Sequence, residues 1–186
     1  MASVEPLKPT LDDLFRTPDK AELIGGRIVR LMATGRKPSR IAGRVGRSLD
    51  AHARHIGEGK AFTSKLAYAI ARLPSGRESF SPDASYYKGP FSDEPMRFIE
   101  GSPTFAAEVR SEGDYTPSAL LGTAEKREDY FQAGTEVVWD VDPIAECVHV
   151  YRAADPEHPV TFQRGQTADA EPAVPGWRVA VDWIFS

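Results

Sequence analysis

The spacing of apolar side chains along the chain separates helical from extended stretches. Residues 39–56 carry apolar side chains at helical spacing, and these fall within about 80° of one another at 100° per residue. The residues that form this apolar face are Ile41, Val45, Leu49 and Ile56. Residues 118–132 show a second helical pattern, with Pro117 near the start and Gly134 just beyond the end. The pattern therefore predicts two long helices, each with a face toward a core.

Extended patterns occur on both sides of these helices. Residues 22–32 contain two β-prone runs around Gly25-Gly26, which predicts a two-residue hairpin. Further strands are predicted at residues 61–71, 82–88, 104–110, 136–141 and 146–152, the last two as a second hairpin near the C-terminus. The order of strand, helix and strand from 104 to 141 indicates a right-handed parallel crossover. We therefore expect an α/β or α+β fold in which helices flank one mixed sheet.

Two short elements are predicted at the ends of the chain. Thr10 can cap a short helix that Pro18 stops, and residues 181–185 form a short apolar element that we expect to pack on the body. A chain of 186 residues is the size of one domain, and we expect residues 1–186 to form a single one. The composition, with 41% hydrophobic and 27% charged residues, is typical of a soluble globular protein rather than a disordered one.

The remaining bulk features concern cellular location. No stretch approaches the roughly 20 apolar residues that a membrane span needs, and the N-terminus lacks the pattern of a signal peptide. The single Cys147 lies in an apolar alternation, cannot form an internal disulfide and is typical of a small buried hydrophobe. These features predict a cytoplasmic protein without membrane association.

The charge is distributed very unevenly. The net charge is -4, but residues 27–65 contain ten basic and two acidic residues, which leaves about +8 there and -12 on the remainder. The predicted arginine face of the 39–56 helix, with the basic residues before it, comprises Arg36, Lys37, Arg40, Arg44, Arg47 and Arg54. This distribution favours contact with a phosphate backbone and makes DNA a candidate partner. An ordinary solvated helix face remains the alternative.

Two carboxylates stand at unusual positions in predicted strands. Glu108 interrupts an otherwise apolar strand, and Asp83 follows Pro82 where another strand begins. An isolated buried carboxylate is costly, so such residues are usually paired, protonated or bound to a cation. On neighbouring strands the two can hold one Mg²⁺, leaving water and a substrate phosphate to complete its shell. Alternatively, Asp83 ends a strand edge and Glu108 faces solvent.

Two further charged residues are candidates for the same site. Lys126 lies on the helix that follows the Glu108 strand, and a helix packed back on the sheet would let it reach the carboxylate pair and hold a water nucleophile. Glu22 precedes the first hairpin. For both residues, a solvated surface position remains the common alternative.

Five segments in order resemble the bacterial Uma-type endonuclease family of the PD-(D/E)XK restriction-endonuclease-like superfamily. The segments are Glu22-Leu23-Ile24-x-Gly26-x-Ile28-Val29, Ser81-Pro82-Asp83, residues 107–111, Lys126-x-x-x-Tyr130-x-x-x-Gly134 and residues 137–143. The resemblance implies a restriction-endonuclease-like mixed sheet, metal ligands at Asp83 and Glu108, the catalytic lysine at Lys126, and Glu22 completing the acidic cluster. It also implies Mg²⁺, with Mn²⁺ as a substitute, and DNA as the substrate. A homodimer is expected because superfamily nucleases often cut two strands as dimers.

The chain departs from the family pattern at two positions. Arg110 stands where the wider superfamily has a lysine, and arginine cannot act as a base because it stays protonated. Pro38 stands where many family members have a histidine. The leading prediction is a Mg²⁺-dependent endonuclease that hydrolyses DNA phosphodiesters. A catalytically silent module that binds DNA or protein is the alternative, and hydrolysis of another phosphate ester is a third hypothesis.

The histidines and tryptophans receive structural interpretations. His52, His55, His149 and His158 lack the spacing of a metal site or a nucleophile motif. Trp139, Trp177 and Trp183 lie in apolar contexts, which favours core or dimer contacts over base stacking.

Overall fold

A six-stranded mixed sheet forms the centre of the computed structural model, which describes residues 8–63 and 65–186. The strand order is β11-β10-β9-β8-β6-β3. The bounds are β3 Lys60–Thr63, β6 Ala84–Tyr87, β8 Phe105–Val109, β9 Val137–Asp142, β10 Cys147–Arg152 and β11 Asp155–Phe162. β8 and β9 are parallel, and the other neighbours are antiparallel. The predicted mixed sheet and parallel crossover are therefore confirmed.

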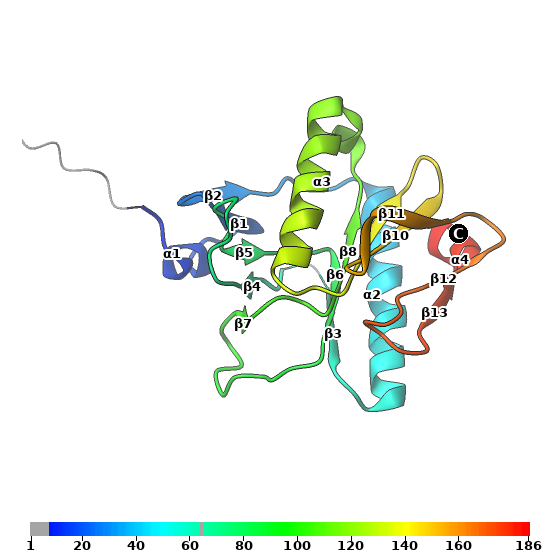
Figure 1. Ribbon diagram of the computed structural model, residues 1–186, viewed down its shortest axis with the longest axis horizontal. Helices are drawn as coiled ribbons and strands as arrows, with labels where there is room; N and C mark the ends of the chain where they lie inside the picture. Colours follow the sequence, from blue (N-terminus) through cyan, green and yellow to red (C-terminus); the bar gives the residue numbers. More distant parts are fainter. Residues whose placement is uncertain (1–7, 64) are drawn as a thin grey trace, which may run out of the picture.

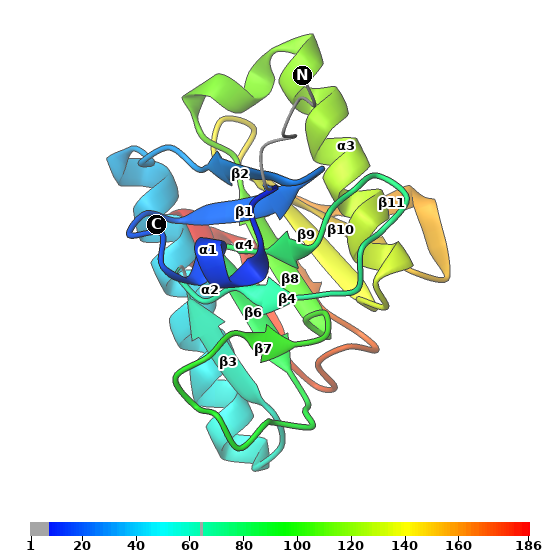
Figure 2. The same ribbon diagram turned by 90° about the vertical axis from the view of Figure 1, so that its left-hand side faces the viewer.

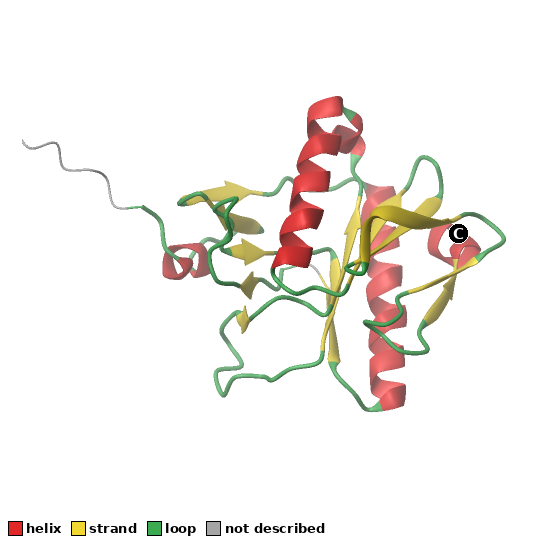
Figure 3. Ribbon diagram, in the orientation of Figure 1, coloured by secondary structure: helices red, strands yellow, loops and turns green. Residues whose placement is uncertain are grey.

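The two long helices cover opposite faces of this sheet (Figures 1 and 3). α2 (Arg36–Ile56) buries Ile41, Val45 and Leu49 in a core shared with β6, β8 and β9. α3 (Pro117–Gln132) lies on the other face, where Tyr130 packs in a second core cluster, and a 3₁₀ turn (Glu112–Tyr115) precedes it. Burial of its apolar face is the main stabilising term for α2. The apolar face predicted for the second long helix is wrong in its N-terminal half, because Leu120 and Leu121 are 40% and 62% exposed and α3 contributes mainly Tyr130 to the core.

Smaller elements from the first hundred residues of the chain pack beside the main sheet (Figure 2). The predicted hairpin is present as β1 (Ala21–Ile24) and β2 (Arg27–Arg30), joined through Gly25 and Gly26 at φ 58° and 70°. β4 (Tyr68–Ala69), β5 (Ser79–Phe80) and β7 (Ile99–Glu100) form a three-stranded sheet, and α1 is Leu11–Phe15. Main-chain bonds from β1 to the segment before β5 fix the hairpin, because Glu78 N donates to Leu23 O at 2.8 Å.

The C-terminal segment packs against α2. β12 (Thr167–Asp169) pairs with β13 (Arg178–Ala180), and α4 (Val181–Phe185) follows at once. The apolar side chains Val181, Ile184 and Phe185 are buried in the α2 core, as predicted. Within the described part of the chain, the helices are too short or too polar to cross a membrane.

Three local predictions differ from the structure. The strand predicted over 61–71 is interrupted, because β3 ends at Thr63 and Lys65 adopts a φ of 99°, which turns the chain into another sheet. α2 begins at Arg36 rather than at residue 39, since a proline is tolerated in the first turn of a helix. β11 was not predicted because its sequence contains two prolines, which an edge strand can accommodate.

Candidate active site

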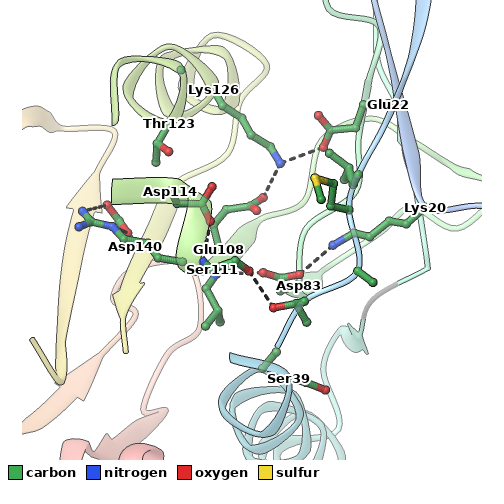
Figure 4. Close-up of a pocket in the computed structure, with 18 of the residues that line it drawn as sticks. Lys20, Glu22, Ser39, Asp83, Glu108, Ser111, Asp114, Thr123, Lys126 and Asp140 are labelled. Atoms are coloured by element: carbon green, nitrogen blue, oxygen red, sulfur yellow. Dashed lines mark hydrogen bonds and ion pairs between the residues drawn. The ribbon is translucent and has the colours of Figure 1, made fainter. Parts of the chain in front are cut away.

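The paired ends of β6 and β8 bring Asp83 and Glu108 together. Ala84 pairs with Ala107 in antiparallel register, so Asp83 lies opposite Glu108. Val109 N donates to Asp83 Oδ2 at 2.9 Å, and Asp83 N donates to Ala107 O at 3.1 Å. These main-chain bonds fix the Asp83 carboxylate beside that of Glu108, at the edge of the pocket shown in Figure 4.

Lys126 reaches this site from α3 and bridges two carboxylates. Its Nζ lies 2.9 Å from Glu108 Oε1 and 2.9 Å from Glu22 Oε1 (Figure 4). Burial alone would lower the pKa of Lys126, but the charges of Glu108 and Glu22 outweigh it and raise the pKa above its usual value. The side chain of Lys126 is therefore a fixed cation in this site.

Glu108 combines a buried carboxylate with one open oxygen. Tyr130 donates to its Oε1 at 2.6 Å, and burial together with Glu108 raises the pKa of this tyrosine well above its usual value. Burial raises the pKa of Glu108, Lys126 offsets part of this, and Asp83 raises it further, so the net pKa is raised. Among the described residues, Oε2 of Glu108 has no hydrogen-bond partner, and the side chain is 22% exposed. That oxygen is the one open to a ligand.

Glu22 is held by cations on both sides. Its Oε1 accepts from Ser81 N at 2.9 Å as well as from Lys126, while Arg77 Nη1 lies 2.5 Å from Oε2. Burial would raise the pKa of Glu22, but Lys126 and Arg77 outweigh it, so the pKa is lowered. Arg77 in turn binds Asp129 of α3 at 2.7 Å. A chain of buried ion pairs thus links β1 to α3 beneath the groove.

Sequence reasoning missed three charged residues of this site. Lys20 Nζ lies 2.8 Å from Asp83 Oδ1, which gives the second carboxylate its own cation (Figure 4). Arg77 and Asp129 support Glu22 as described. Lys20 lies just before the predicted hairpin, two residues before Glu22 in the sequence. Arg77 lies in a turn-like stretch that carried no signal of burial.

Arg110 is turned toward a different pair of carboxylates. Its Nε and Nη2 lie 2.7 Å and 2.6 Å from Asp140 Oδ1 and Oδ2, and its Nη1 lies 3.0 Å from Asp142 Oδ2. Such bidentate pairing fixes the guanidinium firmly. The residue at the superfamily lysine position is therefore bound to the sheet, and among the described residues the lysine in contact with Glu108 is Lys126.

The site opens into a groove with a volume of about 1210 Å³. The β1–β2 hairpin, the N-terminal half of α2 and α3 line this groove. Its basic lining residues, apart from those already described, are Arg30, Arg47, Lys65 and Arg127. Cations around an acidic centre produce a surface that attracts a polyanion while leaving a place for a metal ion.

The six basic residues predicted to contact nucleic acid divide into two groups. Lys37 pairs with Glu146 at 2.8 Å, Arg54 pairs with Asp50 at 2.9 Å, and Arg44 donates to main-chain oxygens of α4. Arg36, Arg40 and Arg47 are exposed and have no ion-pair partner among the described residues. Only Arg47 lines the groove.

Asp83 and Glu108 fit a metal site that is completed by other ligands. The described residues contain no group of three or more His, Cys, Asp or Glu side chains arranged to hold a metal ion. Mg²⁺ is often held by one or two carboxylates, with waters and substrate phosphate in the remaining positions. The donor chemistry of the two carboxylates fits such an ion.

Comparison with known proteins identifies the family and the fold of the chain. Residues 9–182 match the model of the Uma2 family, described as putative restriction endonucleases, and the chain belongs to this family. A crystal structure of a putative nuclease of the DUF820 family from Anabaena variabilis superimposes with a TM-score of 0.74 at 19% identity, covering 95% of this chain and 97% of that one. The restriction-endonuclease-like fold is thereby confirmed. No curated protein matches the chain.

Proposed function

We propose that the protein is an endonuclease that hydrolyses DNA phosphodiester bonds with Mg²⁺ or Mn²⁺. The observation that carries this proposal is the convergence of Asp83, Glu108, Lys126 and Glu22 in one groove. These residues come from four separate parts of the chain, and each has the chemistry that metal-assisted phosphodiester hydrolysis needs.

Asp83 and Glu108 would hold the metal ion. When bound, the metal would stabilise negative charge on the phosphate and lower the pKa of an attacking water. Glu108 offers the open Oε2, and Tyr130 with Lys126 fixes its other oxygen. Asp83 offers Oδ1 once the lysine ammonium of Lys20 moves from it toward a substrate phosphate.

Lys126 supplies a fixed positive charge at the reacting phosphate. Because the carboxylates keep it protonated, it can donate hydrogen bonds to a phosphate oxygen or to the attacking water. Glu22 holds Lys126 in place and is itself neutralised by Arg77, so its role is to position the lysine. A donor of fixed geometry in a partly buried site stabilises a developing charge more effectively than a mobile one.

The test is metal-dependent cleavage of plasmid and oligonucleotide DNA. Asp83→Ala and Glu108→Ala should each reduce the cleavage rate by a factor of about 10³ or more while DNA binding persists. Arg16→Ala is a suitable control because Arg16 is exposed and lies after α1, away from the groove. Cleavage retained in both carboxylate variants at wild-type rates would refute the assignment.

A silent DNA-binding module is the second candidate, and the Lys20–Asp83 ion pair favours it. An ammonium 2.8 Å from the proposed metal ligand can replace the metal permanently. This alternative predicts DNA binding with a steep salt dependence, no cleavage with either Mg²⁺ or Mn²⁺, and no binding of Mn²⁺ to the free protein.

We also propose that the protein acts in the cytoplasm as a homodimer. The free, buried Cys147 is compatible with a reducing compartment, and two copies would allow both strands of a duplex to be cut. Light scattering on the purified protein tests the dimer. A monomeric mass in the presence of DNA would contradict it.

A further inference from the structure

A second hollow lies between α2 and the C-terminal segment. It has a volume of about 530 Å³ and is lined by residues of α2, β13 and α4, including Arg47, Arg178 and Trp183. Arg47 also lines the groove of the candidate active site. The two hollows therefore share one side chain, Arg47 of α2. We call the second hollow the α4 patch and define it by these three residues.

The α4 patch carries positive charge that its surroundings do not neutralise. Arg47 and Arg178 are exposed and have no ion-pair partner among the described residues. The acids nearest in sequence have other cations, because Asp50 pairs with Arg54 at 2.9 Å and Asp182 pairs with Arg164 at 3.3 Å. Asp169 lies opposite Arg178 in the β12–β13 register, but it pairs with Arg152 at 2.9 Å. Its lining includes no acidic residue. The charge of the patch is therefore available to an anionic ligand.

Trp183 presents an aromatic face beside these arginines. Trp139 and Trp177 are buried in the core, but Trp183 is 44% exposed. Its backbone is anchored, because Val181 and Ile184 on either side are buried and Arg44 Nη1 donates to the main-chain oxygen of Trp183 at 3.2 Å. The Arg44 guanidinium carbon also lies 6.0 Å from the centre of the indole ring. An exposed indole on an anchored backbone is a suitable surface for stacking.

We propose that the α4 patch binds an unpaired segment of a DNA strand that continues from the active-site groove. Arg47 and Arg178 would contact consecutive phosphates, and the indole of Trp183 would stack on a base. An unpaired strand is the ligand because a base within a duplex does not expose its face to a side chain. This inference rests on the proposed function for the identity of the polyanion, and it adds a preference for DNA with a single-stranded segment next to the cleaved bond.

The first test uses the fluorescence of Trp183, the exposed tryptophan. In metal-free buffer with a chelator, acrylamide should quench Trp183 much more than the two buried tryptophans. A single-stranded oligonucleotide should lower the acrylamide quenching constant about twofold, and a blunt duplex should lower it less. In Trp183→Phe the oligonucleotide should have no effect on quenching. Unchanged quenching of the wild-type protein at saturating oligonucleotide would overturn the inference.

The second test measures affinity for the same single-stranded oligonucleotide by anisotropy. Trp183→Ala should weaken binding about tenfold, while Trp183→Phe should restore most of it because phenylalanine can stack. Arg178→Met should weaken binding about threefold and reduce the salt slope by about one. Arg16→Met, which removes an equal charge near α1 at the other end of the molecule (Figure 1), should bind normally. Wild-type affinity in Trp183→Ala would also overturn the inference.

The two proposals fail in different ways. A wild-type protein that cleaves DNA while Trp183 stays equally accessible to acrylamide contradicts the α4 patch and leaves the endonuclease assignment intact. A protein whose Trp183 is protected by single-stranded DNA, but which does not cleave with Mg²⁺ or Mn²⁺, supports the patch and contradicts hydrolysis.

Discussion

Two acidic clusters on the same face of the sheet differ in how completely their charges are paired. Glu108 and Arg110 are two residues apart on and just after β8, so their side chains point to the same side. Around Arg110, all four carboxylate oxygens of Asp140 and Asp142 have partners. In Glu108, by contrast, Oε2 has no hydrogen-bond partner among the described residues. Burial and the charge of Asp83 raise the pKa of the Glu108 carboxyl.

The difference separates a fully paired cluster around Arg110 from the proposed active-site cluster around Glu108. The pKa of Asp142 is lowered, because hydrogen bonds from Ala145 N, Tyr115 and Ile144 N together with Arg110 outweigh the effect of burial. Its ionised form therefore stabilises the folded chain. The raised pKa of Glu108 means that its ionised form is disfavoured in the folded chain. A carboxylate kept ionised at some cost is available for a cation, whereas a fully bonded one is not.

The largest expected change in the free energy of unfolding follows removal of the cation that Asp140 and Asp142 share. Arg110→Met leaves Asp140 and Asp142 without their shared partner and should lower the free energy of unfolding by about 3 kcal/mol. Urea denaturation measures this loss. Arg152→Met, which breaks the more exposed Arg152–Asp169 pair, should cost only about 1 kcal/mol. The cleavage rate per folded molecule of Arg110→Met should stay within a few-fold of wild type, and a loss comparable to that of Glu108→Ala would place Arg110 in the reaction.

A smaller change is expected at the hydrogen bond that orients Glu108. Tyr130→Phe removes a 2.6 Å donor to Oε1 while keeping the ring, which stacks on Phe80. The free energy of unfolding should fall by about 1.5 kcal/mol because the bond is to a charged group. Cleavage should fall through kcat rather than KM, since the substrate contacts elsewhere are unchanged. An unchanged kcat would show that Lys126 orients Glu108 without the tyrosine.

The smallest expected change is an increase in the free energy of unfolding rather than a decrease. Glu108→Gln removes a carboxylate whose folded pKa is raised, so its contribution to stability is present at low pH and is lost as the pH rises through that pKa. The variant should therefore match wild type below about pH 4 and be more stable than wild type at neutral pH, while DNA cleavage is lost. Denaturation curves at several pH values test this, with Asp142→Asn as the control that loses stability above the same pH. A variant less stable than wild type at neutral pH would contradict the raised pKa.

The sequence predicted the elements that position the site better than it predicted the site's internal pairing. Helical and alternating patterns located α2, α3, β8 and β9, because burial on one face of an element leaves a periodic signal. Glu108 and Asp83 were recognisable because a carboxylate in an apolar strand violates that signal. The partners Lys20, Arg77 and Asp129 left none, since a charged residue in a loop or on a helix looks the same whether it pairs across the fold or faces water.

The predicted arginine face shows that the partners of exposed basic residues are also not predictable from local sequence. Its six residues share one stretch of sequence, yet two of them have partners distant in sequence, Glu146 for Lys37 and α4 for Arg44. Such partners depend on the return of the C-terminal segment to α2, which no local pattern encodes. Trp183 was assigned to the core or a dimer contact for the same reason, because its exposure depends on where α4 ends against α2.

The bridge of Lys126 between Glu22 and Glu108 also has a consequence for when the candidate site is assembled during synthesis. Glu22 is made early and Lys126 about a hundred residues later, so the pair can close only after most of the chain has left the ribosome. Contacts between such distant residues form late in folding because they close large loops. A partly made chain would therefore hold its acids without their central cation, and the candidate site would be complete only when helix α3 docks.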